Sequence, residues 1–211
     1  LAAAAALLAF LGAGCDGQDQ QTLSEDQSQV SALESISSQN SVDGAVSGYG
    51  WSQDQNGNRL FYQDGLPITG WQLLDGEWYY FDTQGYMQTG LLSSGGKTYY
   101  LDEDGTMHKS WLSLNGQTYY CHYEDGQMMT GWIRINGKWY YMNQDGTMHK
   151  SWLDYDGDRY YCHYEDGYMM TGWIRIGGKW YYMRDDGTML KNGTAPDGSK
   201  VGADGARIEP D

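Results

Sequence analysis

The sequence predicts an all-β protein, a repeat solenoid of stacked β-hairpins preceded by a disordered N-terminal tether. From residue 49 onward, similar units recur about every 20 residues, the period of a stacked array. Within each unit, two short alternating runs flank a dipeptide that tolerates positive φ, which indicates a hairpin. The aromatic residues are 19 Tyr and nine Trp against three Phe, so nearly every ring carries a polar group and suits a half-hydrated surface.

The chain begins with an uncharged Ala- and Leu-rich segment, residues 1–14, that is typical of the apolar region of a signal peptide. As a helix it would extend only about 21 Å, too short for a hydrocarbon core of about 30 Å. No basic residue precedes it, so we expect the basic region of the signal to be missing from this sequence. The run from Leu11 to Cys15 resembles a bacterial lipoprotein processing box, in which Cys15 would be acylated. Ordinary signal cleavage and an inert thiol at Cys15 are the alternatives.

Residues 15–47 are dominated by Ser, Gln, Asp and Glu and contain almost no aromatic residue. Such a segment buries too little apolar surface to offset the entropy lost on ordering. It is therefore predicted to be a flexible tether.

Residues 48–192 are predicted to form seven hairpin repeats, and residues 193–211 a degenerate closing repeat. The units begin at Trp51, Trp71, Leu91, Trp111, Trp132, Trp152 and Trp173. Their predicted type I′ turns are Asp75-Gly76, Gly95-Gly96, Asn115-Gly116, Asn136-Gly137, Asp156-Gly157 and Gly177-Gly178. A single hairpin is marginal in water, so the units must bury their faces against one another. We expect Met107, Met148, Met170 and Met189 to fill the gaps between them.

The net charge of −15 disfavours binding to nucleic acid and adsorption to anionic lipid, leaving a lipid anchor as the one route to a membrane. The chain carries no nucleophile elbow, phosphate loop or zinc-protease motif, so we predict no enzyme activity and no cofactor. Cys121-His122 and Cys162-His163 suggest a metal site at first sight. Adjacent strand residues point to opposite faces, however, and no second ligand pair accompanies them, so no metal is expected.

Residues 130–148 (TGWIRINGKWYYMNQDGTM), 171–189 and 70–90 resemble the choline-binding, or cell-wall-binding, repeats of Gram-positive surface proteins. The resemblance covers about residues 49–211. It implies a left-handed β-solenoid that holds the choline of teichoic acids between consecutive hairpins. Aromatic faces suit a quaternary ammonium, which has no N–H to donate and is attracted by the electron-rich rings.

In that family a site is walled by the leading Trp of a unit, the aromatic residue seven positions later, and the equivalent residue of the next unit. The first two walls are present at Trp71 with Trp78, Trp132 with Trp139, and Trp173 with Trp180, and Trp111 and Trp152 are further candidates. The third position holds Thr98 after the first pair, Arg159 after the second and a residue near Lys200 after the third. Neighbouring Tyr residues are the alternative source of a third wall.

The predicted function is therefore that of an exported, non-catalytic surface protein that binds choline groups of a cell-wall polymer. Its location would be the cell surface or wall, with lipid anchoring at Cys15 as an addition. Binding of glucans or host glycans, and a structural adhesin or spacer that presents the array to a protein partner, remain as alternatives.

Overall fold

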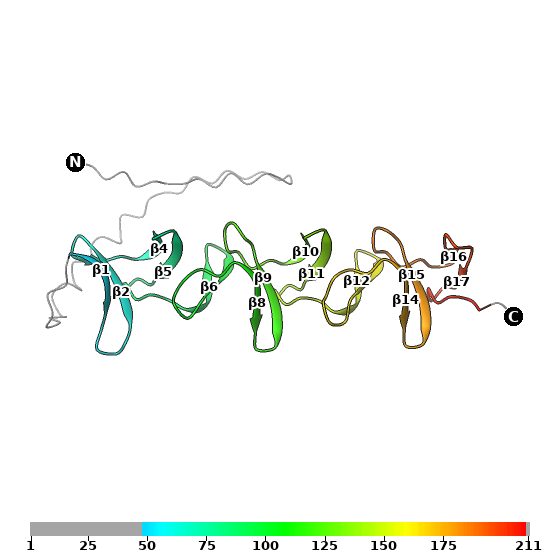
Figure 1. Ribbon diagram of the computed structural model, residues 1–211, viewed down its shortest axis with the longest axis horizontal. Helices are drawn as coiled ribbons and strands as arrows, with labels where there is room; N and C mark the ends of the chain where they lie inside the picture. The colour runs from blue at the N-terminus through cyan, green and yellow to red at the C-terminus, as the bar shows by residue number, and fades with distance from the viewer. Residues whose placement is uncertain (1–47, 210–211) are drawn as a thin grey trace. The chain divides into compact units, whose positions relative to one another are not determined.

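The computed structural model describes residues 48–209, so the expected signal segment, Cys15 and the tether lie outside the described residues. The described part is built from short antiparallel strands, with no helix among these residues, as the sequence predicts (Figure 1). The hairpins are β1 (Tyr49–Gln53) with β2 (Arg59–Gln63), β4 (Gly70–Leu74) with β5 (Glu77–Phe81), β6 (Gly90–Ser94) with β7 (Lys97–Leu101), β8 (Ser110–Leu114) with β9 (Gln117–Cys121), β10 (Gly131–Ile135) with β11 (Lys138–Met142), β12 (Ser151–Tyr155) with β13 (Asp158–Cys162), β14 (Gly172–Ile176) with β15 (Lys179–Met183), and the shorter β16 (Gly193–Thr194) with β17 (Lys200–Val201). The two-residue β3 (Leu66–Pro67) pairs with β2.

The predicted turns have the backbone that a type I′ hairpin requires. Asn136 and Gly137, for example, have φ values of 50° and 81°, and the other five dipeptides are also positive at both positions. The first hairpin differs, because a longer loop joins β1 to β2. In this loop Asp54 Oδ1 accepts the backbone N–H groups of Asn56 and Asn58, at 2.9 and 2.8 Å. Because this loop is longer than the two-residue turns of the other six hairpin repeats, β2 begins further along the sequence from Trp51 than the second strand of any of these repeats does from its leading residue.

Each hairpin has two different faces, because successive strand residues alternate across it. In β10–β11 the front face carries Trp132 opposite Tyr141, and the back face carries Ile133 opposite Tyr140. Ile133 and Tyr140 pack in a core cluster with Trp111 and Tyr120, which belong to the front of the preceding hairpin. The hairpins therefore stack front to back.

Backbone hydrogen bonds tie each hairpin to the loop that follows the next one. The Met148 N–H donates to the Thr118 carbonyl at 2.7 Å, and the Met169 N–H donates to the Trp139 carbonyl at 2.7 Å. The same bond recurs along the array. The remaining donor–acceptor pairs are Met87 to Arg59, Met107 to Trp78, Met128 to Thr98, Met189 to Arg159, and Arg207 to Trp180. These bonds fix the spacing between consecutive hairpins.

The four methionines predicted as core residues do lie in the packed interior. Met107, Met148 and Met189 are buried, and Met170 packs against the cluster around Ile174.

The hairpins β1–β2, β8–β9 and β14–β15 point the same way in Figure 1, with two other hairpins between each. The same relation holds between β4–β5 and β10–β11. Among the described residues, no helix is long and apolar enough to cross a membrane.

The two repeat cysteines are free and fully buried. Burial raises the pKa of the Cys121 thiol to about 11 and that of Cys162 to about 12. Since the thiolate is the reactive form, both thiols are expected to resist iodoacetamide at pH 8 in the folded chain and to react after denaturation. Peptide mass mapping of the two states measures this directly. Rapid native labelling at Cys121 or Cys162 would contradict the packed arrangement.

Candidate ligand-binding site

A corner of two aromatic rings recurs between consecutive hairpins, and the pair around Trp132 shows its geometry. The Trp132 ring lies 5.2 Å from Tyr141, its cross-strand partner, and 5.1 Å from Tyr160 of the next hairpin. The Trp132 and Tyr160 planes are inclined by 60°. Edge-to-face contacts of this kind are favourable because the ring edge is positive and the ring face negative. We call such a pair of rings an aromatic corner.

Four further interfaces have the same contact between a leading Trp and a Tyr of the following hairpin. The centroid distances are 5.1 Å for Trp51–Tyr79, 4.8 Å for Trp71–Tyr99, 4.9 Å for Trp111–Tyr140 and 5.1 Å for Trp152–Tyr181. The interface headed by Leu91 has no ring at the leading position, and Leu91 is exposed.

These contacts decide between the two expected sources of the third wall. The following hairpin contributes its back-face Tyr, one residue after the position that holds Thr98 or Arg159. The hairpins stack front to back, so the interface is formed by the back face of the next hairpin. Thr98 and Arg159 lie on the front face of that hairpin and point away from the interface, whereas the adjacent Tyr99 and Tyr160 lie on its back face and point into it. Tyr99 and Tyr160 thus supply the rings that a search at the equivalent position misses. The alternation of the strands was the signal for finding them.

The remaining wall depends on one further position of each hairpin, which we call the slot residue. It is found by taking the residue two positions after the leading residue and then its partner on the opposite strand; for Trp132 these are Arg134 and Trp139. The slot residues are Arg59, Trp78, Thr98, Thr118, Trp139, Arg159 and Trp180. Trp78 shares the front face with Trp71, and Trp139 shares it with Trp132. The structure therefore places Trp78 on the same front face as Trp71, which contacts Tyr99, and Trp139 on the same front face as Trp132, which contacts Tyr160. We call each group a three-ring set: Trp71, Trp78 and Tyr99, and Trp132, Trp139 and Tyr160.

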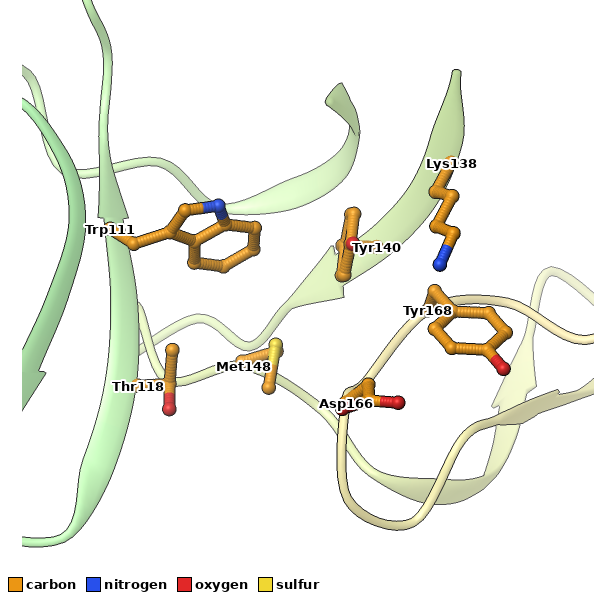
Figure 2. Close-up of a pocket in the computed structure, with 7 residues that line it drawn as sticks. All are labelled: Trp111, Thr118, Lys138, Tyr140, Met148, Asp166 and Tyr168. Atoms are coloured by element: carbon orange, nitrogen blue, oxygen red, sulfur yellow. The ribbon is translucent and has the colours of Figure 1, made fainter. Parts of the chain in front are cut away.

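At the Trp111 interface the slot residue is the short Thr118, and a cavity of about 370 Å³ opens there. Figure 2 shows Trp111 and Thr118 at one end of the residues that line this cavity and Lys138 and Tyr168 at the other, with Tyr140 and Met148 between them. The Lys138 ammonium lies 4.2 Å from the centre of the Tyr168 ring. This interface offers two rings and an open third side.

Arginine is the slot residue at the Trp51 and Trp152 interfaces. The Arg59 guanidinium carbon lies 4.4 Å from the centre of the Trp51 ring, and that of Arg159 lies 5.2 Å from the Trp152 ring. Trp152, predicted from sequence as a ligand contact, therefore already has a cation over its ring. Sequence spacing missed Arg59, because the longer first loop places Asn58 seven residues after Trp51.

At the last interface of the array, the leading Trp173 has contacts that differ from those of the other leading residues. Trp173 contacts Tyr182 of its own hairpin at 5.3 Å, and its indole N–H donates to Asp197 Oδ2 at 3.0 Å. The following short pair β16–β17 supplies no ring, and the guanidinium carbon of Arg207 lies 5.8 Å from the Trp173 ring. Trp173 and Trp180 therefore share a front face without a third aromatic wall.

Aspartates lie near several of the interface tyrosines. Burial, followed by the charge of Asp104, raises the pKa of Tyr79, and burial followed by Asp166 raises that of Tyr140. The pKa of Tyr160 is raised in the same way by burial and neighbouring aspartates. A nearby carboxylate disfavours a phenolate and favours a cation. Among the described residues, no three His, Cys, Asp or Glu side chains converge as metal ligands.

Two known family models match the repeats of this chain. The family model described as "Choline-binding repeat" matches residues 68–109, 89–130 and 129–171, and the one described as "Putative cell wall binding repeat" matches residues 171–189. Together the matches run from residue 68 to residue 189, more than half of the chain. No curated protein sequence matches.

Two solved structures from Streptococcus pneumoniae are similar to the chain. CbpJ is 35% identical with a TM-score of 0.72, and choline binding protein F, solved with a peptidoglycan analogue, is 31% identical with a TM-score of 0.72. Each alignment covers 76% of this chain and 58% of the other, so the chain spans less than two thirds of these relatives. The described residues thus form an aromatic hairpin-repeat module of the cell-wall-binding class. Residues 68–189 carry repeats of the choline-binding and cell-wall-binding families.

Proposed function

We propose that the chain is a non-catalytic surface protein that binds the choline groups of cell-wall teichoic acid through its aromatic interfaces. The observation that carries the proposal is the three-ring arrangement at Trp132, Trp139 and Tyr160, repeated at Trp71, Trp78 and Tyr99. A quaternary ammonium needs electron-rich faces and no hydrogen-bond acceptor. The neighbouring aspartates add attraction for a cation.

Each site is weak by itself. A ring contributes about 0.5–2 kcal/mol to cation binding, so three rings give about 4 kcal/mol, equivalent to a dissociation constant of about 1 mM. Hairpins β4–β5 and β10–β11, which carry the two three-ring sets, point the same way in Figure 1. A polymer with many cholines could then occupy both, and the gain in effective concentration would raise the affinity for the polymer well above that for free choline.

Titration of the purified chain with choline tests the proposal. We expect near-ultraviolet circular dichroism to saturate in the millimolar range, because the ligand orders the indole rings, and we expect a diethylaminoethyl matrix to retain the chain until free choline elutes it. Isothermal titration gives the number of sites.

The double variant Trp78→Ala/Trp139→Ala provides the matched test, because it removes one ring from each three-ring set. Its affinity at both sites should fall about 10-fold, a loss of about 1.4 kcal/mol. Leu66→Ala, an exposed residue of β3 outside the hairpins that carry the two sets, serves as the control and should leave the titration unchanged. Retention on dextran or host glycans that choline does not reverse would instead favour the carbohydrate alternative.

Attachment to the membrane through Cys15 forms part of the same proposal and rests on the apolar segment that precedes it. Mass spectrometry of the chain isolated from an expressing bacterium would show a diacylglyceryl group on Cys15 as the first residue. An unmodified N-terminus beyond residue 15 would contradict lipidation while leaving choline binding unaffected.

A further inference from the structure

Two of the recurrent aromatic corners contain an arginine of the chain itself. At the Trp51 and Trp152 interfaces the guanidinium carbons of Arg59 and Arg159 lie 4.4 and 5.2 Å from the leading rings, within the range of a cation–π contact. The Tyr of the following hairpin is in place at both, 5.1 Å from the leading Trp. Both interfaces therefore have two rings and a cation.

The backbone shows that these arginines occupy the position of the third ring. Arg159 pairs with Asp154 across β12–β13 as Trp139 pairs with Arg134 across β10–β11. Its carbonyl accepts the Met189 N–H at 2.7 Å, as the Trp139 carbonyl accepts the Met169 N–H. One substitution at an otherwise matched position thus replaces an aromatic wall by a cation.

Further contacts hold each guanidinium in place. Arg159 Nε lies 2.8 Å from Asp154 Oδ1, and Arg59 Nη1 donates to the Asp104 carbonyl at 2.9 Å. Each guanidinium thus contacts both a Trp ring and an oxygen atom, and these two contacts keep it over the Trp. Arg134 is different, because its guanidinium carbon lies 5.9 Å from the slot ring Trp139, with no such contact to the leading Trp132.

We propose that Arg59 and Arg159 are built-in cations that fill the Trp51 and Trp152 corners and exclude choline from them. The inference rests on the proposed choline binding and adds which interfaces take ligand. A choline entering a filled corner would have to displace a guanidinium from the same ring face, and two cations cannot share it. At the interfaces that have a Trp–Tyr corner, the slot residue therefore determines whether the corner takes choline. The Arg59 guanidinium also reaches the Asp104 carbonyl, in the loop that follows β7.

The test uses two variants of the purified chain, Arg159→Trp and Arg159→Thr, which copy the slot residues Trp139 and Thr118. Isothermal titration with choline should give one more site per chain than the unmodified protein in both variants. Trp completes a third wall and Thr only vacates the corner, so the new site in Arg159→Trp should bind more tightly. Lys150→Thr is the control, because it removes the same charge from an exposed loop residue and should leave the site number unchanged.

A second readout is thermal stability without choline. Arg159→Thr should melt at a lower temperature than Lys150→Thr, because Arg159 contacts the Trp152 ring and the Asp154 carboxylate whereas Lys150 is an exposed loop residue, and saturating choline should raise its melting temperature more than that of the control. If both Arg159 variants bind the same number of cholines as the unmodified chain, and that chain binds choline normally, the inference about Arg159 is overturned and the proposed choline binding still stands. Absence of choline binding by the unmodified chain would overturn the proposed function. In that case, equal melting temperatures of Arg159→Thr and Lys150→Thr would also remove the structural role of the guanidinium.

Discussion

Replacing Trp132 by alanine is expected to eliminate one choline site and to lower the free energy of unfolding by about 2–3 kcal/mol. Burying an aromatic side chain contributes about 3–5 kcal/mol in a fully buried core, and Trp132 is only half-buried, so a smaller loss follows. In the native chain the Trp132 ring packs against Tyr141, Tyr160 and Tyr155, at 5.2, 5.1 and 6.3 Å, and alanine reaches none of these rings. Denaturant unfolding and choline titration measure the two effects.

The controls separate packing from ligand binding. Trp132→Phe keeps a ring with a weaker quadrupole, so it should recover part of both losses. Leu91→Ala changes the leading residue of a hairpin that has no ring there and is 61% exposed, and it should alter stability by less than about 0.5 kcal/mol and leave binding unchanged. Full choline stoichiometry in folded Trp132→Ala would show that this corner takes no ligand.

Substituting Gly126 by alanine is expected to destabilise the chain by about 2–5 kcal/mol through two effects of similar size. Gly126 has φ of 69°, where a side chain costs about 1–2 kcal/mol. A Cβ there would lie 2.5 Å from Met107 Sδ and 2.7 Å from both of its neighbouring carbons. Met107 is buried, so overpacking adds about 1–3 kcal/mol. Denaturant unfolding measures the total.

Gly116→Ala isolates the backbone part of this loss. Gly116 has a similar φ of 75°, but a Cβ there would meet nothing within 4 Å, so only the conformational cost of about 1–2 kcal/mol should appear. Because the Met107 N–H donates to the Trp78 carbonyl, Gly126→Ala should also weaken choline binding at the Trp71 interface, whereas Gly116→Ala should not. Equal destabilisation by the two variants would mean that Met107 moves aside at no cost.

The hairpins and their turns were predictable because their causes are local. Asn136-Gly137 tolerates positive φ at both positions, and the flanking residues alternate with the period of a strand. The first hairpin shows the limit of this reasoning. Its longer loop displaces the slot residue to Arg59, and only the pairing of Gln53 with Arg59 reveals the equivalence with the other units.

Residue type and regular spacing were enough to predict the hairpin repeats and the leading tryptophans, and they paired Trp71 with Trp78 and Trp132 with Trp139, which share a hairpin face in the structure. The second ring of each corner became known only from the folded arrangement of the hairpins. The stacking of a front face on the next back face selects Tyr99 and Tyr160 over Thr98 and Arg159 as the facing rings. It also places the Arg159 guanidinium over Trp152. Alternation along a strand separates its residues into two faces, but contacts between hairpins depend on which faces meet, and only the stacking of the hairpins decides that.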